Sequence, residues 1–159
     1  KVAACFGMKL EESVVGYLST SSEYSNIHDG LAQVIKEGFV IKVETSGSGV
    51  AAAEFKFVHD KVREAAYSLI PESKVNQYHY RLGMILYSTT KGKDLDDIIL
   101  YTADQINHGV ESLPVQCSEL RVDLAKVNEM AGVKAAERTD YVAARSYLST
   151  ALSLLPTDH

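Results

Sequence analysis

Cysteine is scarce in this sequence, and its placement gives no sign of a disulfide framework or a zinc finger. The 159 residues include 2 cysteines, Cys5 and Cys117, which lie far apart and belong to no CxxC pattern. Small secreted domains rely on dense disulfides, whereas proteins of reducing compartments keep free thiols. We therefore expect two free cysteines and a cytoplasmic location.

Long apolar runs and clusters of basic residues are missing as well. No stretch is as long and apolar as a membrane-spanning helix must be, so we expect no membrane partner. The 16 lysines and arginines are outnumbered by 21 aspartates and glutamates, which gives a formal net charge of -5. Because a nucleic-acid surface needs clustered Lys and Arg to neutralise phosphates, we also expect no nucleic-acid partner.

The sequence lacks the motifs that carry catalysis or hold a cofactor. Gly92-Lys93 is followed by Asp94 and therefore does not complete a Walker A loop, and GxGxxG, HExxH and GxSxG are absent. No two of the 5 histidines have the spacing of helical metal ligands. We expect no enzyme activity, metal or cofactor in this fragment. A Cys5–His59 or Cys117–His108 catalytic pair is the alternative, although no sequence pattern favours it.

The pattern of apolar residues predicts a mainly α fold with one small β hairpin. Apolar residues have helical spacing over residues 10–19. They have it again in a second helix, which Ser25 would cap and Gly38 would end. Alternation of apolar and polar residues then predicts strands over 39–43 and 54–58. The first seven residues are interpreted as the back half of a truncated helix. Three helices followed by a hairpin are typical of a winged helix, so we expect residues 1–71 to form a winged-helix-like module.

The remaining residues, 72–159, are predicted to form helical hairpins. An apolar stripe from Val62 to Leu69 already follows the hairpin within the first module. In residues 72–159, further stripes run from Tyr78 to Ile85, Leu95 to Ile106, Leu120 to Ala131 and Tyr141 to Leu155, with Asp140 as the last cap. Gly132, Tyr141, Ala144, Leu148, Ala151 and Pro156 fall at the spacings of a tetratricopeptide repeat. A generic helical hairpin is the alternative. A single repeat is normally unstable, so we expect the array to continue beyond this chain.

His59 and Asp60 stand where the second predicted strand becomes a helix. A helix N-terminus offers free N–H groups and positive potential, which favour a phosphate, and a histidine there could donate to a phosphate oxygen. Asp60 would cap the helix, an interaction worth about 1 kcal/mol. In the alternative interpretation, which the local sequence by itself favours, Asp60 is only a cap and His59 only packs.

Residues 55–71, FKFVHDKVREAAYSLIP, and 76–87, NQYHYRLGMILY, carry a resemblance to a known family. They resemble the region after the ATPase core in signal-transduction ATPases with numerous domains, a branch of the AAA-type P-loop proteins. The resemblance is strongest to large proteins that join a protein kinase, an origin-recognition-like ATPase, helical repeats and a histidine kinase. Residues 124–156 resemble the helical continuation of that family.

The resemblance implies a winged helix followed by tetratricopeptide-like helices, which together relay the state of an ATPase domain. In related ATPases a winged-helix histidine contacts the β-phosphate of ADP, and His59, beside Asp60, matches that position. The expected partners are an upstream ATPase domain of the same protein, which would bind ADP or ATP with Mg, and downstream helical repeats or a protein partner. The parent protein would be an ATPase or a kinase, although the Walker A and Walker B segments are not in this chain.

Two other functions stay open from the sequence. The helical part could be a scaffold that binds a peptide in a groove. The winged helix could bind DNA through residues 25–38, but Lys36 is the only lysine or arginine in that segment. We expect the relay function rather than either of these.

Overall fold

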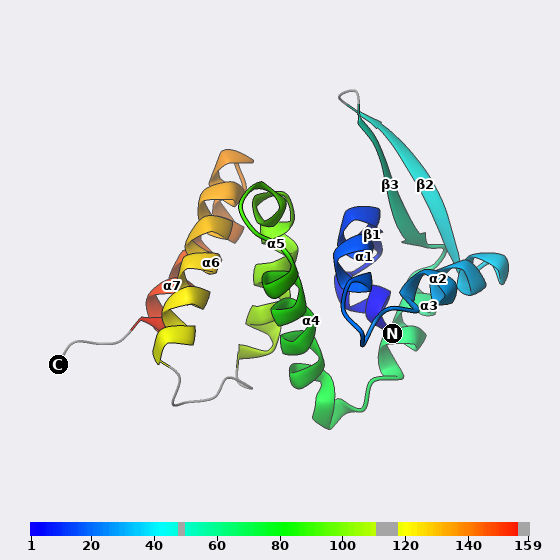
Figure 1. Cartoon of the computed structure of the whole chain (residues 1–159), viewed down its shortest axis with the longest axis horizontal. Coiled ribbons are helices and arrows are strands. Elements are labelled where there is room, and N and C mark those ends of the chain that lie inside the picture. Colours follow the sequence, from blue (N-terminus) through cyan, green and yellow to red (C-terminus); the bar gives the residue numbers. More distant parts are fainter. Residues whose placement is uncertain (48–49, 111–117, 156–159) are drawn as a thin grey trace. The chain divides into compact units, whose positions relative to one another are not determined.

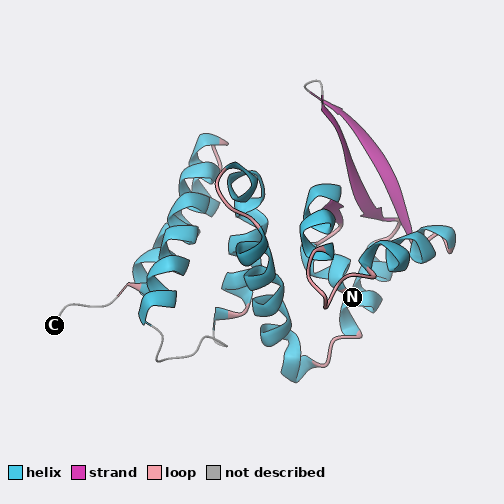
Figure 2. Ribbon diagram, in the orientation of Figure 1, coloured by secondary structure: helices cyan, strands magenta, loops and turns pink. Residues whose placement is uncertain are grey.

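The computed structural model describes residues 1–47, 50–110 and 118–155. The chain is mainly helical with a small antiparallel sheet of three strands (Figures 1 and 2). It divides into two compact units, here called unit 1 (Lys1–Val75) and unit 2 (Asn76–His159). The domain boundary that the sequence places after residue 71 stays a prediction.

Unit 1 contains all of the sheet. Its elements are the 3-10 helix η1 (Val2–Phe6), β1 (Lys9–Glu11), α1 (Glu12–Ser19), α2 (Ile27–Lys36), β2 (Val40–Gly47), β3 (Val50–Phe57) and α3 (Asp60–Ser68). β3 lies between β1 and β2 and is antiparallel to both. The predicted hairpin is therefore confirmed, with both strands longer than expected.

The third strand, β1, corrects the prediction of a single hairpin and of a helix that starts at Leu10. Leu10 pairs with Phe55 in the sheet and is buried, and α1 begins only at Glu12. Three residues are too few to show the alternation by which a strand is recognised. Gly38, at φ 77°, ends α2 as expected, but the N-cap is Asn26 instead of Ser25 and makes no side-chain cap bond.

Unit 2 consists of helices. The 3-10 helix η2 (Glu72–Lys74) lies at the end of unit 1 and leads into α4 (Val75–Thr89), which is followed by α5 (Lys93–His108), α6 (Ser118–Glu137) and α7 (Tyr141–Leu154). The apolar stripe predicted for α5 is buried throughout. Asp140 caps α7 by accepting a hydrogen bond from the Ala143 N–H at 3.0 Å, as expected. Pro114, Cys117 and Pro156 lie outside the described residues.

The buried faces of α4 and α7 differ from the prediction by about one residue. His79, Leu82 and Leu86 are buried on α4, where Tyr78 and Ile85 are only partly buried. On α7 the buried large side chains are Tyr147 and Leu154, whereas Tyr141, Leu148 and Leu155 are exposed. Residues three and four apart lie on neighbouring faces of a helix. A helix that is rich in apolar residues can therefore bury either of two adjacent faces, and the sequence pattern does not distinguish them.

Three glycines allow helices to approach closely in unit 2. A Cβ atom on Gly109, just after α5, would lie 2.5 Å from the Asn76 carbonyl oxygen and 2.6 Å from the Tyr80 backbone nitrogen on α4. A Cβ atom on Gly83 of α4 would lie 2.6 Å from Ile106 Cγ1 and 2.8 Å from the Ile106 backbone nitrogen on α5. A Cβ atom on Gly132 of α6 would lie 2.7 Å from Leu148 Cγ on α7. Gly83 therefore meets backbone, which cannot move aside, whereas Gly132 meets a side chain.

Candidate functional site

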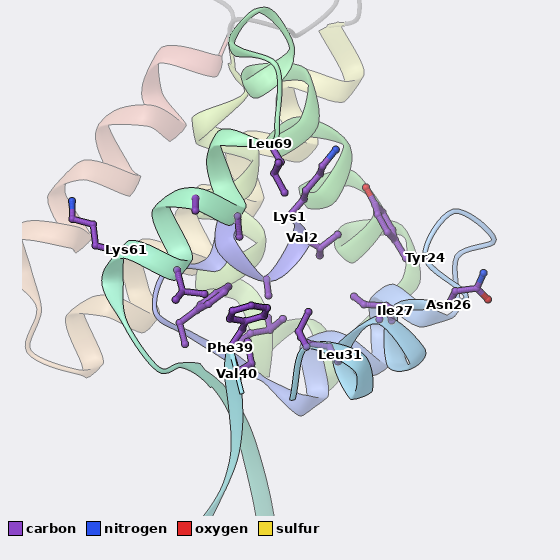
Figure 3. Close-up of a pocket in the computed structure, with 18 of the residues that line it drawn as sticks. Lys1, Val2, Tyr24, Asn26, Ile27, Leu31, Phe39, Val40, Lys61 and Leu69 are labelled. Atoms are coloured by element: carbon purple, nitrogen blue, oxygen red, sulfur yellow. The ribbon is translucent and has the colours of Figure 1, made fainter. Parts of the chain in front are cut away.

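An apolar groove of about 870 Å³ opens in unit 1 and is here called the α2–α3 groove (Figure 3). One wall is α2, through Ile27, Leu31 and Val34, and the other is α3. Phe39 and Val40 lie at the base of the groove, at the start of β2, and Val2 of η1 faces it from another side. Leu10 of β1 and Phe57 of β3 also line the groove, so the two helices, η1 and all three strands form it together.

The α3 wall carries a complete apolar stripe that unit 1 buries only in part. Val62, Ala65, Ala66 and Leu69 follow one another at i, i+3, i+4 and i+7, and all four line the groove. None of the residues of α3 is buried, and Leu69 at the end of the helix is 61% exposed. The predicted stripe is thus present, but it faces the groove and not a closed core.

His59 and Asp60 lie at the start of α3. His59 is the N-cap residue, with an extended backbone at φ -152° and ψ 143°, and its carbonyl oxygen accepts hydrogen bonds from the N–H groups of Val62 (3.0 Å) and Arg63 (3.3 Å). Both side chains are exposed, and no side-chain cap bond is formed. Asp60 is the first helical residue, so its prediction as the cap is wrong. Its carboxylate lies in the first turn, where the helix dipole favours negative charge.

Unit 2 holds a histidine pair. The rings of His79 (α4) and His108 (α5) stack with their centres 4.9 Å apart. His79 is only 2% exposed, and its Nδ1–H donates to Oε1 of Gln105 at 2.8 Å. Burial lowers the pKa of His79, the Gln105 hydrogen bond opposes this, and the nearby His108 lowers the pKa further. The expected partly buried, hydrogen-bonded histidine is thus found, with deeper burial than expected.

The lowered pKa of His79 predicts that acid destabilises unit 2. Below pH 6.5, the ordinary value, the unfolded chain binds a proton at this position more readily than the folded chain does. The free energy of unfolding should therefore fall as the pH drops below 6.5 and level off below the folded-state pKa. Urea unfolding on both sides of pH 6.5 measures the slope.

Two variants isolate the histidine responsible for this pH dependence. His79→Gln should flatten the slope because it removes the buried titrating group. His28→Gln, which removes an exposed histidine of α2, should leave the slope as it is. An unchanged slope in His79→Gln would show that another group causes the acid sensitivity.

A second, smaller hollow of about 360 Å³ lies between α5 and α7, next to His108. Tyr147 donates its hydroxyl hydrogen to Oδ1 of Asp104 at 2.5 Å, and His108 Nδ1–H donates to the Asp104 carbonyl oxygen at 2.9 Å. Sequence reasoning missed Asp104, Asn107 and Tyr147. The spacing of Asp104, Asn107 and His108 along α5, at i, i+3 and i+4, is the signal that could have found them.

Neither hollow shows a catalytic arrangement among the described residues. Burial raises the pKa of the Cys5 thiol to about 12, with a smaller opposing effect of the N-terminal ammonium, so Cys5 is a poor nucleophile near neutral pH. No three His, Cys, Asp or Glu side chains gather as a metal site in the part of the chain that the structure describes. Within the same ranges, none of the helices has the length and apolar character that crossing a membrane requires.

Comparison with known proteins gives one distant similarity. The chain is 28% identical to hybrid signal transduction histidine kinase G of Dictyostelium discoideum over an alignment of 116 residues that covers 64% of this chain. The matched part spans only 3% of that protein. No family model and no solved structure matches the chain.

Proposed function

We propose that this chain is a non-catalytic relay segment of a multidomain signalling ATPase. Unit 1 would respond to the nucleotide state of an ATPase domain in the same cytoplasmic protein, and unit 2 would pass the change to further helical repeats or to a protein partner. The similarity to a hybrid histidine kinase supports a place in a signalling protein. ADP or ATP with Mg would be bound by the ATPase domain.

The order and pairing of elements in unit 1 support its interpretation as a winged helix. A short helical segment, a short strand, two helices and two longer strands follow one another in the chain. The last strand lies in the middle of the antiparallel sheet. This is the arrangement that the resemblance implies, with β1 as the strand that the sequence pattern missed.

The packing of α6 against α7 supports a tetratricopeptide-like hairpin in unit 2. Gly132 permits the two helices to cross closely, and Ala144 and Ala151 on α7 are buried. Small residues at these positions are what the repeat requires, because they let two helix backbones approach. A hairpin of this kind gains stability by stacking on neighbours, which suits a relay element.

The exposed position of His59 is the observation on which the nucleotide-sensing role rests. Its ring is accessible at a strand-to-helix junction, and the helix that follows offers N–H groups and positive potential at that end. Asp60 in the first turn would repel a phosphate, so the contact would be made by the imidazole. A contact formed in one nucleotide state only would shift docking by about 1–3 kcal/mol, a typical coupling energy.

Two substitutions at this junction test the proposal. His59→Ala should change the unfolding free energy of the chain by less than about 0.5 kcal/mol, because the side chain is exposed. Asp60→Ala should cost about 0.3–1 kcal/mol through the helix dipole. In the full-length protein, His59→Ala should speed ADP dissociation and raise basal signalling, because a contact of the ADP-bound state is lost.

Melting curves of the chain and ADP dissociation rates of the full-length protein separate the two interpretations of His59. Asp60→Ala serves as the matched control, since it alters the same junction without removing the imidazole. If His59→Ala unfolds unit 1 and leaves the ADP dissociation rate unchanged, His59 is a packing residue and the sensing role is wrong.

A peptide-binding scaffold is the second candidate function, and the surface of α6 and α7 favours it. Met130 and Val133 on α6 and Leu148 and Leu152 on α7 are exposed apolar side chains. DNA binding is a weaker third candidate. Lys36 is the only lysine or arginine of α2, which also carries Asp29 and is followed by Glu37, and recognition helices need basic residues.

A further inference from the structure

The α2–α3 groove is open along two helical walls whose stripes match in spacing. Ile27, Gly30, Leu31 and Val34 of α2 lie at i, i+3, i+4 and i+7, like the four stripe residues of α3. A helix of 9 residues is marginal by itself, because helices in proteins gain most of their stability from a buried apolar face. The exposed stripe of α3 thus has the character of a surface that a further element covers.

The walls indicate that this element is a helix. An extended peptide needs backbone hydrogen bonds from its site, and the sides of α2 and α3 have none to give, because their N–H and C=O groups are used within each helix. A helix satisfies its own backbone and offers only side chains. The 10 residues of α2 extend over about 15 Å, which corresponds to roughly three turns of such a helix.

The placement of polar groups argues against a small molecule as the occupant. Small-molecule sites hold a few polar groups that converge on the ligand. The charged residues that line the α2–α3 groove are Lys1, Glu23 and Lys61, and Figure 3 shows the two lysines well apart from each other, so they do not converge on one point. The groove can therefore recognise an apolar face with charges beside it.

The charged residues that line the groove indicate which charges a bound helix carries beside its apolar face. Lys61 lies at one side of the groove, and its 80% exposed side chain is paired only within its own helix, to Glu64 at 2.7 Å. Such an exposed pair is easily exchanged. Lys1 adds a second cation, and Glu23 is the one acidic residue among those that line the groove, so the lining carries more positive than negative side chains. We infer that the α2–α3 groove binds an amphipathic helix of a partner protein, with apolar residues at i, i+3, i+4 and i+7 and acidic residues beside them.

A second copy of this chain fits the groove less well. Among the described helices, α6 and α7 of a second copy offer exposed apolar side chains. On α6 these are only Met130 and Val133, an i, i+3 pair in place of the four positions that the groove presents. On α7 they include Leu148 and Leu152, but α7 has Arg145 and no aspartate or glutamate between its first and last residues. It would bring a cation to a groove that already holds Lys1 and Lys61. The inference does not depend on the nucleotide role of His59, so the two can fail separately.

Two designed peptides test the inference by fluorescence anisotropy with the full chain. Each has about 14 residues and leucines at i, i+3, i+4 and i+7; one carries glutamates beside the leucines and the other lysines. At low ionic strength the glutamate peptide should bind about tenfold more tightly than the lysine peptide. Lys61→Glu should reduce or reverse that preference.

Paired leucine variants locate the binding surface. Leu69→Gln should weaken binding of the glutamate peptide by about tenfold, since a buried leucine contact is lost, whereas Leu152→Gln should not change it. Both leucines are exposed, so both variants should fold, as their circular dichroism and melting will show. The inference is overturned if neither peptide binds, if Leu69→Gln has no effect, or if the charge of the peptide makes no difference. A dimer that Leu69→Gln dissociates would overturn it as well, because the occupant would then be a second copy.

Discussion

Gly83→Ala is expected to destabilise unit 2 by about 3 kcal/mol or more. The new Cβ atom would lie 2.8 Å from the backbone nitrogen of Ile106 and 3.2 Å from the backbone carbonyl carbon of Gln105. Alanine has the better helix propensity by about 1 kcal/mol, but this gain is smaller than the cost of separating α4 from α5. Urea unfolding followed by circular dichroism measures the difference.

Gly16→Ala in α1 is the matched control for this substitution. A Cβ atom at Gly16 would have nothing within 4 Å, so the change should stabilise unit 1 by about 0.5–1 kcal/mol. Gly132→Ala should fall between the two, because the Leu148 side chain that it meets is partly exposed and can move. If Gly83→Ala and Gly16→Ala had equal effects, α4 and α5 would not be in contact at Gly83.

Leu124→Ala should cost about 2–5 kcal/mol of unfolding free energy. The Leu124 side chain is fully buried among the residues of α5, α6 and α7 that form the core of unit 2. Its removal leaves a cavity that the surrounding helices can fill only in part. The measurement is again the urea midpoint and slope of the unfolding transition.

Leu152→Ala removes the same atoms from an exposed position and should change stability by no more than about 0.5 kcal/mol. Leu152 is 71% exposed on α7. Similar losses for Leu124→Ala and Leu152→Ala would contradict the placement of the core, or would show that the exposed face of α7 is covered in solution.

The strongest sequence patterns predicted the type of each long element correctly. The stripe of α5 and the strands of the hairpin repeat over enough residues to define a period, and Gly38 and Asp140 mark ends through their own backbone or side-chain chemistry. Shorter elements could not be predicted in this way. β1 has only 3 residues and depends on pairing with β3, a contact far away in the sequence.

The candidate site could be predicted only in fragments. The stripe of Val62 to Leu69 was visible in the sequence, but a stripe does not tell whether it faces a core or an open groove, because that depends on what lies opposite. Asp60 was predicted as a cap because aspartate often has that role, whereas the helix begins one residue earlier than that prediction requires. The histidine pair depends on the packing of α4 against α5, which no local pattern encodes.

The position of β2 has a consequence for how molecules of this protein avoid one another. Within unit 1, β2 pairs with β3 on one side only, so its other side is an edge to which a strand of another molecule could be added. The apolar run from Phe39 to Val43 is interrupted there by Lys42, which pairs with Glu12 at 2.7 Å and lies over the Phe55 ring. A charged residue within an otherwise apolar edge strand lowers the tendency of that strand to join the sheet of another molecule, so Lys42 acts as a gatekeeper against aggregation of the sheet.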